Sequence, residues 1–411
     1  MGKFRVEFFL PFLLSLALTG LLLPMHLSNI TLIIFIMSSF ILQISQKRSI
    51  VPKKRQLFFA GFFLLFPLGM LYTENSNYGW KIVERNMVWF LIPSIVPMGL
   101  IMKKSTLFKS FKFFSLAVHL LIYGLLIMAF LDYLTRGDSQ VFYYDQLTKP
   151  INFHPVYLAV YLLFGMLILI ESWRKKELYI SKYVLVLLVL FDFVLLVLLS
   201  SKTVLISFVI VLLVLLFREL KTMRQIGLSI IGIIALGALV MKFSETKKRI
   251  NDSLFSSWEL LDKETFKYND PFTGITLRLI TWKYVVKKYV AKENLFIGIG
   301  TGDDRDFINE VYKDRNMDDA GYLNFNLHNQ YLEYFLKFGL IGLLYFLTIL
   351  FLSFRKAIKE KNKLYFSFLL IFCLFSLTES NLEVQRGIVF FVLINAIFYF
   401  FPQPTEQKEN E

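Results

Sequence analysis

The apolar runs YVLVLLVLFDFVLLVLL (residues 183–199) and VLISFVIVLLVLLF (residues 204–217), joined by SSKT (residues 200–203), decide the fold of this chain. A helix needs about 20 apolar residues to cross the hydrocarbon core of a bilayer, or somewhat fewer when its polar ends reach the interface. Both runs come close to this length. The stretch therefore predicts two consecutive transmembrane helices.

The same pattern recurs along the whole chain. The hydrophobic share of 56% and the mean hydropathy of +0.57 exceed those of an ordinary soluble domain. Twelve stretches of spanning length are expected, near residues 8–27, 30–45, 57–72, 87–102, 113–134, 156–172, 183–199, 204–217, 227–243, 329–352, 364–379 and 388–401. We predict an all-α integral membrane protein with about 12 transmembrane helices, the first of which is retained and not cleaved.

Basic residues gather in alternate connections between the expected helices. The basic clusters lie near residues 47–55, 103–112, 174–176, 218–224 and 355–363, whereas the connections 73–86 and 136–155 hold few. Positively charged connections stay in the cytoplasm. We therefore expect a multi-pass protein of the cell inner membrane with both termini cytoplasmic. The net charge of +14 then reflects contact with membrane lipid, and no nucleic-acid partner is expected.

One connection, residues 244–327, is much longer than the others and falls on the periplasmic side. A loop of this length between spans usually has a function, and we expect it to form a helical subdomain between helices 9 and 10. Within it, an interfacial helix is predicted over Thr276–Val290 by the helical spacing of four apolar side chains, Leu279, Trp282, Val286 and Tyr289. The predicted division is 1–243 for helices 1–9, 244–327 for the loop, 328–402 for helices 10–12 and 403–411 for a cytoplasmic tail.

Four motifs follow one another in the second half of the chain: GITLRLITWK (residues 274–283), GIGTG (298–302), HNQYLE (328–333) and GLIG (339–342). In this order they resemble the O-antigen ligase and polymerase superfamily, from about Phe191 to Gly387. The resemblance implies a metal-independent, cofactor-free glycosyltransferase that moves a glycan from undecaprenyl diphosphate to a hydroxyl acceptor at the periplasmic face. The ligase branch, with lipid A-core as acceptor, is preferred. The polymerase branch and the protein O-oligosaccharyltransferase branch remain open.

Breaking a sugar–phosphate bond requires fixed positive charge at the leaving diphosphate and a base at the acceptor hydroxyl. His328, at the outer start of the tenth helix, is the candidate base. Arg278 is the candidate diphosphate clamp, because guanidinium binds phosphate through two donors at once. Lys202 stands where the superfamily usually has an arginine after a serine, so it would supply charge without that fork. Further substrate contacts are expected from Trp282, Tyr331, His154 and Arg386, and no metal ligand is assigned.

Structural roles remain open for the same side chains, since a histidine can cap a helix, an arginine can face solvent and a lysine can snorkel. Asp192, in the middle of the seventh helix, is interpreted as a hydrogen-bonded packing residue. Asp304 and Asp306 match the acidic pair of metal-dependent sugar transferases, but such short matches are common and a metal site is not expected. The rival class is a transporter or flippase of lipid-linked sugars, disfavoured by the scarcity of polar residues in the spans.

Overall fold

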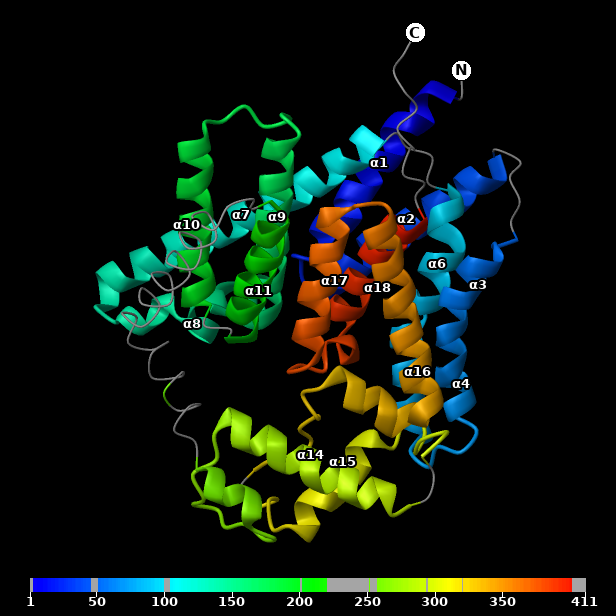
Figure 1. The fold of residues 1–411 in the computed structure, drawn as a ribbon, viewed down its shortest axis with the longest axis vertical. Coiled ribbons are helices and arrows are strands. Elements are labelled where there is room, and N and C mark those ends of the chain that lie inside the picture. Colours follow the sequence, from blue (N-terminus) through cyan, green and yellow to red (C-terminus); the bar gives the residue numbers. More distant parts are fainter. Residues whose placement is uncertain are drawn as a thin grey trace.

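The computed structural model consists of α-helices joined by turns and short 3-10 helices (Figure 1). It describes residues 3–45, 51–99, 104–199, 202–219, 251, 257–292, 295–319 and 321–400, and these contain no β-strand. The predicted all-α class is therefore confirmed for this part of the chain.

Eleven of the twelve predicted stretches coincide with helices. These are α1 (Lys3–Gly20), α2 (Met25–Ser45), the run α3 (Lys54–Gly61), η1 (Phe62–Leu64) and α4 (Leu65–Gly69), α6 (Val88–Gly99), α7 (Lys104–Arg136), α9 (Pro155–Arg174), α10 (Lys182–Leu198), α11 (Lys202–Glu219), α16 (Gln330–Lys359), α17 (Lys363–Ser376) and α18 (Gln385–Phe400). The stretch at 227–243 lies outside the described residues. The total of twelve spans thus stays a prediction.

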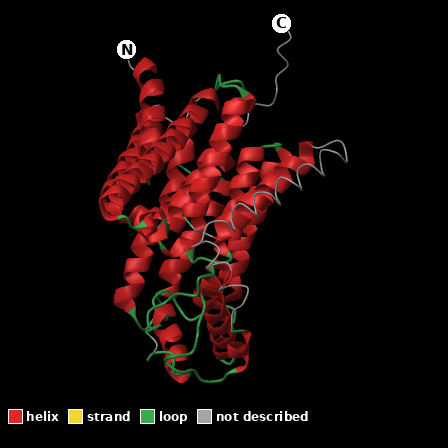
Figure 2. Ribbon diagram, turned by 90° about the vertical axis from the view of Figure 1, so that its left-hand side faces the viewer, coloured by secondary structure: helices red, strands yellow, loops and turns green. Residues whose placement is uncertain are grey.

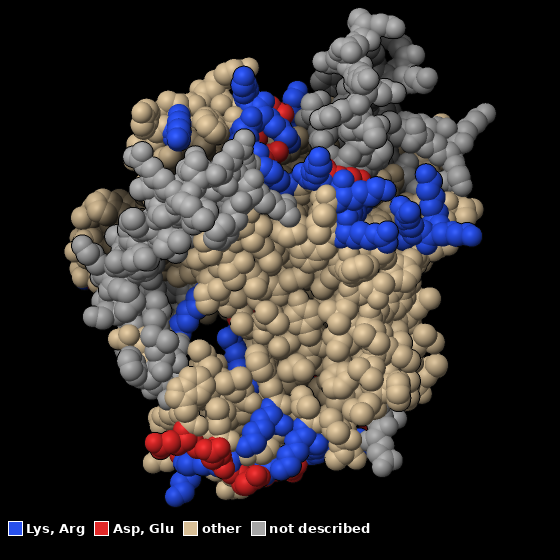
Figure 3. Space-filling model, in the orientation of Figure 1, with Lys and Arg blue, Asp and Glu red and all other residues tan. Residues whose placement is uncertain are grey.

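Within the part of the chain that the structure describes, four helices are long and apolar enough to cross a membrane: Met25–Ser45, Thr106–Arg136, Pro155–Arg174 and Gln330–Lys359. Large apolar side chains on their outer faces are exposed, among them Ile33, Met37 and Ile41 on α2. These side chains recur at helical spacing, as expected for a lipid-facing stripe. Figure 3 shows an uncharged belt between charged residues at its two ends. The chain is a membrane protein with several apolar helices.

Helix α18 forms the centre of the bundle. Its residues from Gly387 to Tyr399 are all buried, and it packs against α6, α16 and α17. A helix that is apolar on all sides has this environment. Aromatic rings fill the space around it, with the Phe372 and Phe391 rings stacked at 3.9 Å. The start of α1 and the end of α18 lie at the same end of the molecule (Figure 1).

The other end of the molecule carries a region of short helices and loops (Figure 2). It contains η4 (Trp258–Asp262), α14 (Gly274–Val290) and α15 (Asp304–Asp314), which share a hydrophobic cluster of their own. Between the spans lie also α5 (Ser76–Asn86), η2 (Ser139–Phe142), α8 (Tyr144–Thr148) and η3 (Lys149–Ile151). The expected helix near residues 276–290 is present. Of its predicted apolar face, Tyr289 is buried, whereas Leu279, Trp282 and Val286 are only partly buried. The other large buried side chains of this helix are Ile280, Tyr284 and Val285.

Helix α16 contains a sharp break at Gly339, where φ is +63° and ψ is −159°. The segment 295–300 lies along this break: Ile299 N–H donates to Leu336 O, and Leu340 N–H donates to Leu295 O. A Cβ atom on Gly298 would stand 2.2 Å from Lys337 O, and one on Gly339 would stand 2.3 Å from Phe296 C. The glycine-rich motif at residues 298–302 therefore permits two backbones to cross at close range.

Candidate functional site

The two residues predicted to act together, His328 and Arg278, meet at a third. Glu379 accepts from Arg278 Nη2 through Oε1 at 2.9 Å, and its Oε2 lies 3.0 Å from His328 Nδ1. The three residues come from the turn before α16, from α14 and from the segment after α17. A carboxylate that binds both groups fixes their distance and orientation. The prediction that they share one site is thus consistent with this geometry.

The turn that carries His328 is held by neighbours on all sides. His328 itself has φ of +47°, and its N–H donates to Asn326 Oδ1 at 3.0 Å. The next residue, Asn329, caps α16 by accepting from Tyr331 N–H and Leu332 N–H. Ser380, adjacent to Glu379, accepts from Asn329 N–H at 3.2 Å. An unusual backbone conformation supported in this way is typical of functional sites.

Glu333 and Trp282 complete this support. The buried Glu333 carboxylate accepts from Leu327 N–H and from Ser380 Oγ, both at 2.9 Å. Trp282 Nε1 donates to Leu327 O at 2.6 Å. The indole thus uses its single N–H to position the turn that carries His328. The predicted contact of Trp282 with a sugar would have to use the ring face.

The start of α11 reaches the same place. The hydroxyl groups of Thr203 and Thr378 form a hydrogen bond of 2.6 Å, and Thr378 directly precedes Glu379. Lys202 is the first residue of α11 and is partly exposed. Its neighbours Ser200 and Ser201 lie outside the described residues. The contact between Thr203 and Thr378 therefore brings the start of α11 next to the segment that carries Glu379, which the Arg278–Glu379–His328 triad shares. Figure 3 shows an opening between the helix bundle and the outer region, with basic side chains at its edge.

His154 lies close enough to the site for the charges of Glu379 and His328 to affect its pKa. It caps α9, with Nδ1 accepting from Val156 N–H at 3.4 Å, and its ring lies edge-on to Tyr144 and Tyr157. Burial lowers the pKa of His154, against the opposing charges of Glu379 and Asp145. The neutral ring is the form that can accept the capping hydrogen bond.

Tyr331 and Arg386, the two other predicted substrate contacts, are engaged in packing. Tyr331 Oη donates to Cys373 O at 3.1 Å, which ties α16 to α17. The Arg386 guanidinium lies 4.0 Å from the centre of the Phe153 ring and donates to Leu23 O at 3.2 Å. Neither contact involves the triad. These two residues therefore connect helices rather than converge on His328.

A buried ionic network, not foreseen from the sequence, lies beside the triad. Lys337 Nζ is 2.5 Å from Glu383 Oε2 and 3.3 Å from Asp304 Oδ2, and all three side chains are almost inaccessible to solvent. Arg85 of α5 is 3.4 Å from Glu383. Burial raises the pKa of Asp304, whereas burial of Glu383 is outweighed by Lys337 and Arg85, so its pKa is lowered. A lysine inside a helix as apolar as α16 is a signal that could have revealed this network.

The acidic pair Asp304 and Asp306 does not point to a shared ligand. Asp304 faces Lys337, while Asp306 Oδ2 accepts from Asn75 Nδ2 at 2.7 Å. Within the described ranges, no group of three or more His, Cys, Asp or Glu side chains is placed to hold a metal ion. The pair instead connects α15 to α16 and to the segment before α5.

Asp192 is buried in a hydrogen-bonded cluster between α7 and α10. His119 Nε2 lies 2.9 Å from Asp192 Oδ2, and Tyr123 Oη donates to Asp192 Oδ1 at 3.1 Å. This arrangement fits the packing role expected for Asp192. No sequence pattern predicts the contact of His119 with Asp192, because the two residues are 73 positions apart in the chain.

Comparison with known families finds a match in a region that includes three of the predicted site residues. A family model described as O-antigen ligase matches residues 185–347, which contain Lys202, Arg278 and His328 but not Glu379. The search of the curated proteins found no match. Residues 185–347 thus form an O-antigen ligase domain, and this match supports the resemblance of the chain to the O-antigen ligase superfamily.

Proposed function

We propose that this chain is a glycosyltransferase that moves a glycan from undecaprenyl diphosphate to a hydroxyl acceptor. Among the possible acceptors we favour lipid A-core, which is the acceptor of the ligase branch. The observation that carries the proposal is the Glu379 carboxylate, which holds His328 and Arg278 side by side within the O-antigen ligase domain. A base and a phosphate-binding cation in one site are the two groups that this transfer requires.

His328 acts as the general base in this proposal. Its Nδ1 donates to Glu379, which leaves the lone pair of Nε2 to take the proton of the acceptor hydroxyl. The hydroxyl oxygen then forms a bond to C1 of the donor sugar. The bond from C1 to the diphosphate oxygen breaks, and its electron pair stays on that oxygen. A carboxylate behind an imidazole sets the tautomer and stabilises the imidazolium that forms.

Arg278 and Lys202 stabilise the charge that develops on the leaving diphosphate. A guanidinium has five N–H donors, so the contact with Glu379 leaves others for phosphate oxygens. Lys202 adds a cation from the start of α11, close to Thr378. No metal and no cofactor are needed in this scheme, because the donor is already activated and the two side chains supply the positive charge.

The proposed orientation places this site in the periplasm and both termini in the cytoplasm of a cell with an inner membrane. The support is the distribution of charge: the basic turns after α9 and α16 lie at the end of the molecule opposite α14 and α15 (Figure 1). We further propose that residues 1–243 and 328–402 form two membrane parts and that residues 244–327 form the outer loop between them.

Transfer from a purified lipid-linked glycan by the full chain tests the activity. His328→Ala should lower kcat by about 10²- to 10⁴-fold, as expected for loss of a general base, while His26→Ala, at an exposed histidine, should not change it. Near-normal turnover of a folded His328→Ala variant would contradict the assignment of the base.

The acceptor is tested in a deletion strain. Intact polymer that accumulates on the carrier supports the ligase, whereas single-unit glycans at the surface would identify a polymerase. Glycans missing from proteins alone would identify a protein glycosyltransferase. Flipping of the donor without bond formation in reconstituted vesicles would favour the transporter class instead.

A further inference from the structure

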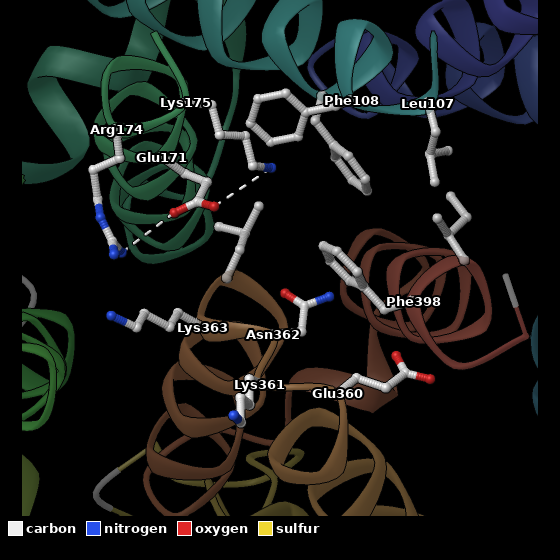
Figure 4. A pocket seen from close by; sticks show the side chains of 13 residues that line it. Leu107, Phe108, Glu171, Arg174, Lys175, Glu360, Lys361, Asn362, Lys363 and Phe398 are labelled. Atoms are coloured by element: carbon white, nitrogen blue, oxygen red, sulfur yellow. Dashed lines mark ion pairs between the residues drawn. The ribbon is translucent and has the colours of Figure 1, made fainter. Parts of the chain in front are cut away.

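The end of the bundle opposite His328 contains a cavity of about 210 Å³. Its walls come from the start of α7, the end of α9, the turn between α16 and α17, and the end of α18 (Figure 4). These segments lie far apart in the sequence and meet at the end where the uncharged belt of the surface stops. The cavity is therefore built at the depth of a membrane interface.

One side of the cavity is strongly basic. Four cationic side chains line it, Arg174, Lys175, Lys361 and Lys363, against two carboxylates, Glu171 and Glu360. Both carboxylates are already paired with cations. Glu171 lies 3.5 Å from Arg174 and 3.4 Å from Lys175, and Glu360 lies 2.7 Å from Lys356. The local balance of charge is thus positive and favours an anion.

Arg174 and Lys363 reach from facing helices toward the same side of the opening (Figure 4). Lys363 begins α17, whose first-turn N–H groups add partial positive charge at the cavity. Asn362 caps this helix by accepting from Tyr365 N–H at 3.0 Å. The basic wall is thus formed by side chains on ordered helix ends rather than by a mobile tail.

The opposite side of the cavity is apolar and aromatic. It is formed by Leu107, Phe108, Phe111, Leu364, Ile397 and Phe398. The Phe111 and Phe398 rings stack at 5.1 Å, and Lys175 Nζ lies 3.8 Å above the Phe108 ring. A ligand that fits both walls must have an anionic group and an adjoining apolar part.

We propose that this cavity binds the headgroup of an anionic phospholipid, with the phosphate near Arg174 and Lys363 and the acyl chains along the apolar wall. A volume of about 210 Å³ suits a headgroup but not a whole lipid, so the chains must leave the cavity into the bilayer. Basic pockets between transmembrane helices at the cytoplasmic interface bind such lipids. A soluble phosphate would use the basic wall alone and leave the aromatic wall without a partner.

The experiment uses the full chain in nanodiscs of phosphatidylcholine that contain increasing fractions of phosphatidylglycerol. Native mass spectrometry counts the retained phosphatidylglycerol, and thermal unfolding reports the accompanying shift in Tm. The test variant is Arg174→Gln/Lys363→Gln. Its control, Arg355→Gln/Lys359→Gln, removes the same charge from exposed residues that do not line the cavity. A parallel series adds soluble glycerol 3-phosphate in pure phosphatidylcholine.

The wild type and the control should retain phosphatidylglycerol preferentially and gain thermal stability from it. The test variant should lose about tenfold in affinity, since two cations near the headgroup are removed. Equal loss in both double variants would mean a diffuse surface attraction and would overturn the proposal. A full shift in Tm from glycerol 3-phosphate alone would also overturn it, in favour of a soluble anion. Neither readout depends on glycan transfer, so the result stands apart from the proposed catalysis.

Discussion

Replacing Glu379 with glutamine should disable the site without changing its shape. The carboxylate now accepts from His328 Nδ1 and Arg278 Nη2. A glutamine keeps one acceptor oxygen, which Arg278 can retain, and presents its NH₂ group to His328. The Nδ1 atom must then become an acceptor, and the ring proton moves to Nε2. The imidazole would face the acceptor hydroxyl with a proton already in place.

The expected loss follows from the two contacts. A hydrogen bond to a charged group contributes about 1.5–3 kcal/mol. The side chains of Arg278, His328 and Glu379 are 27%, 30% and 20% exposed, so solvent reduces this value. We expect a total loss of about 2–4 kcal/mol in transition-state stabilisation, which corresponds to a decrease of about 30- to 1,000-fold in kcat.

Steady-state transfer from a purified lipid-linked donor measures this decrease, and the loss should appear in kcat more than in KM. Nitrogen NMR of labelled histidine would detect the change of tautomer. Glu84→Gln, at an exposed glutamate of α5, is the matched control and should behave as the wild type. A folded Glu379→Gln variant with kcat within about threefold of the wild type would refute the role of the carboxylate.

Three further outcomes are expected. Lys202→Ala should raise the KM for the donor about tenfold, because one partly exposed contact to phosphate is lost. Lys202→Arg should restore the KM of the wild type. Equal kinetics for both variants would exclude a diphosphate contact. Lys337→Met should lower the free energy of unfolding by about 3–5 kcal/mol, because it removes the buried cation that Asp304 and Glu383 share and leaves each carboxylate with only a more distant arginine. In the same denaturation assay, Lys356→Met, at a more exposed pair, should cost less than about 1 kcal/mol. Burial lowers the pKa of His154 from its usual 6.5, with Glu379, Asp145 and His328 as the charged neighbours. The folded state therefore resists protonation and loses stability as the pH falls below that value. The variant His154→Asn keeps a capping side chain and should show a flatter dependence of Tm on pH between 7 and 5.

The helices were predictable because apolar runs of spanning length leave few alternatives. Eleven predicted stretches coincide with helices, and the boundaries move by several residues where polar ends continue the helical backbone, as at Lys104 of α7. The amphipathic helix α5 was missed since it lies in a short polar connection that was interpreted as a loop. The buried face of α14 was predicted only in part: Tyr289 is buried as expected, but Tyr284 and Val285 join a hydrophobic cluster shared with η4 and α15, which the pattern of a single helix does not reveal.

The site was predictable only where a motif carried it. His328, Arg278 and Lys202 stand in recognisable motifs, and the structure brings their segments together. Glu379 has no such pattern: it is one acid in a short outer connection, and its role depends on a contact with Arg278 across 101 residues. The partners of Lys337 were hidden for the same reason. Contacts between distant segments are set by tertiary packing, which local periodicity does not encode.

The break in α16 at Gly339 has a consequence for the biogenesis of this protein. At this break, four backbone groups of α16 bond to residues 295–300: the carbonyls of Leu336 and Lys337 and the N–H groups of Leu340 and Ile341. Backbone groups without partners are costly in an apolar environment, so a nascent chain would favour an unbroken helix. We expect the bend to form only when residues 295–300 fold onto this helix. Since the bend sets the direction of the part of α16 that begins next to His328, a chain in which residues 295–300 have not yet folded should lack the contact between His328 and Glu379.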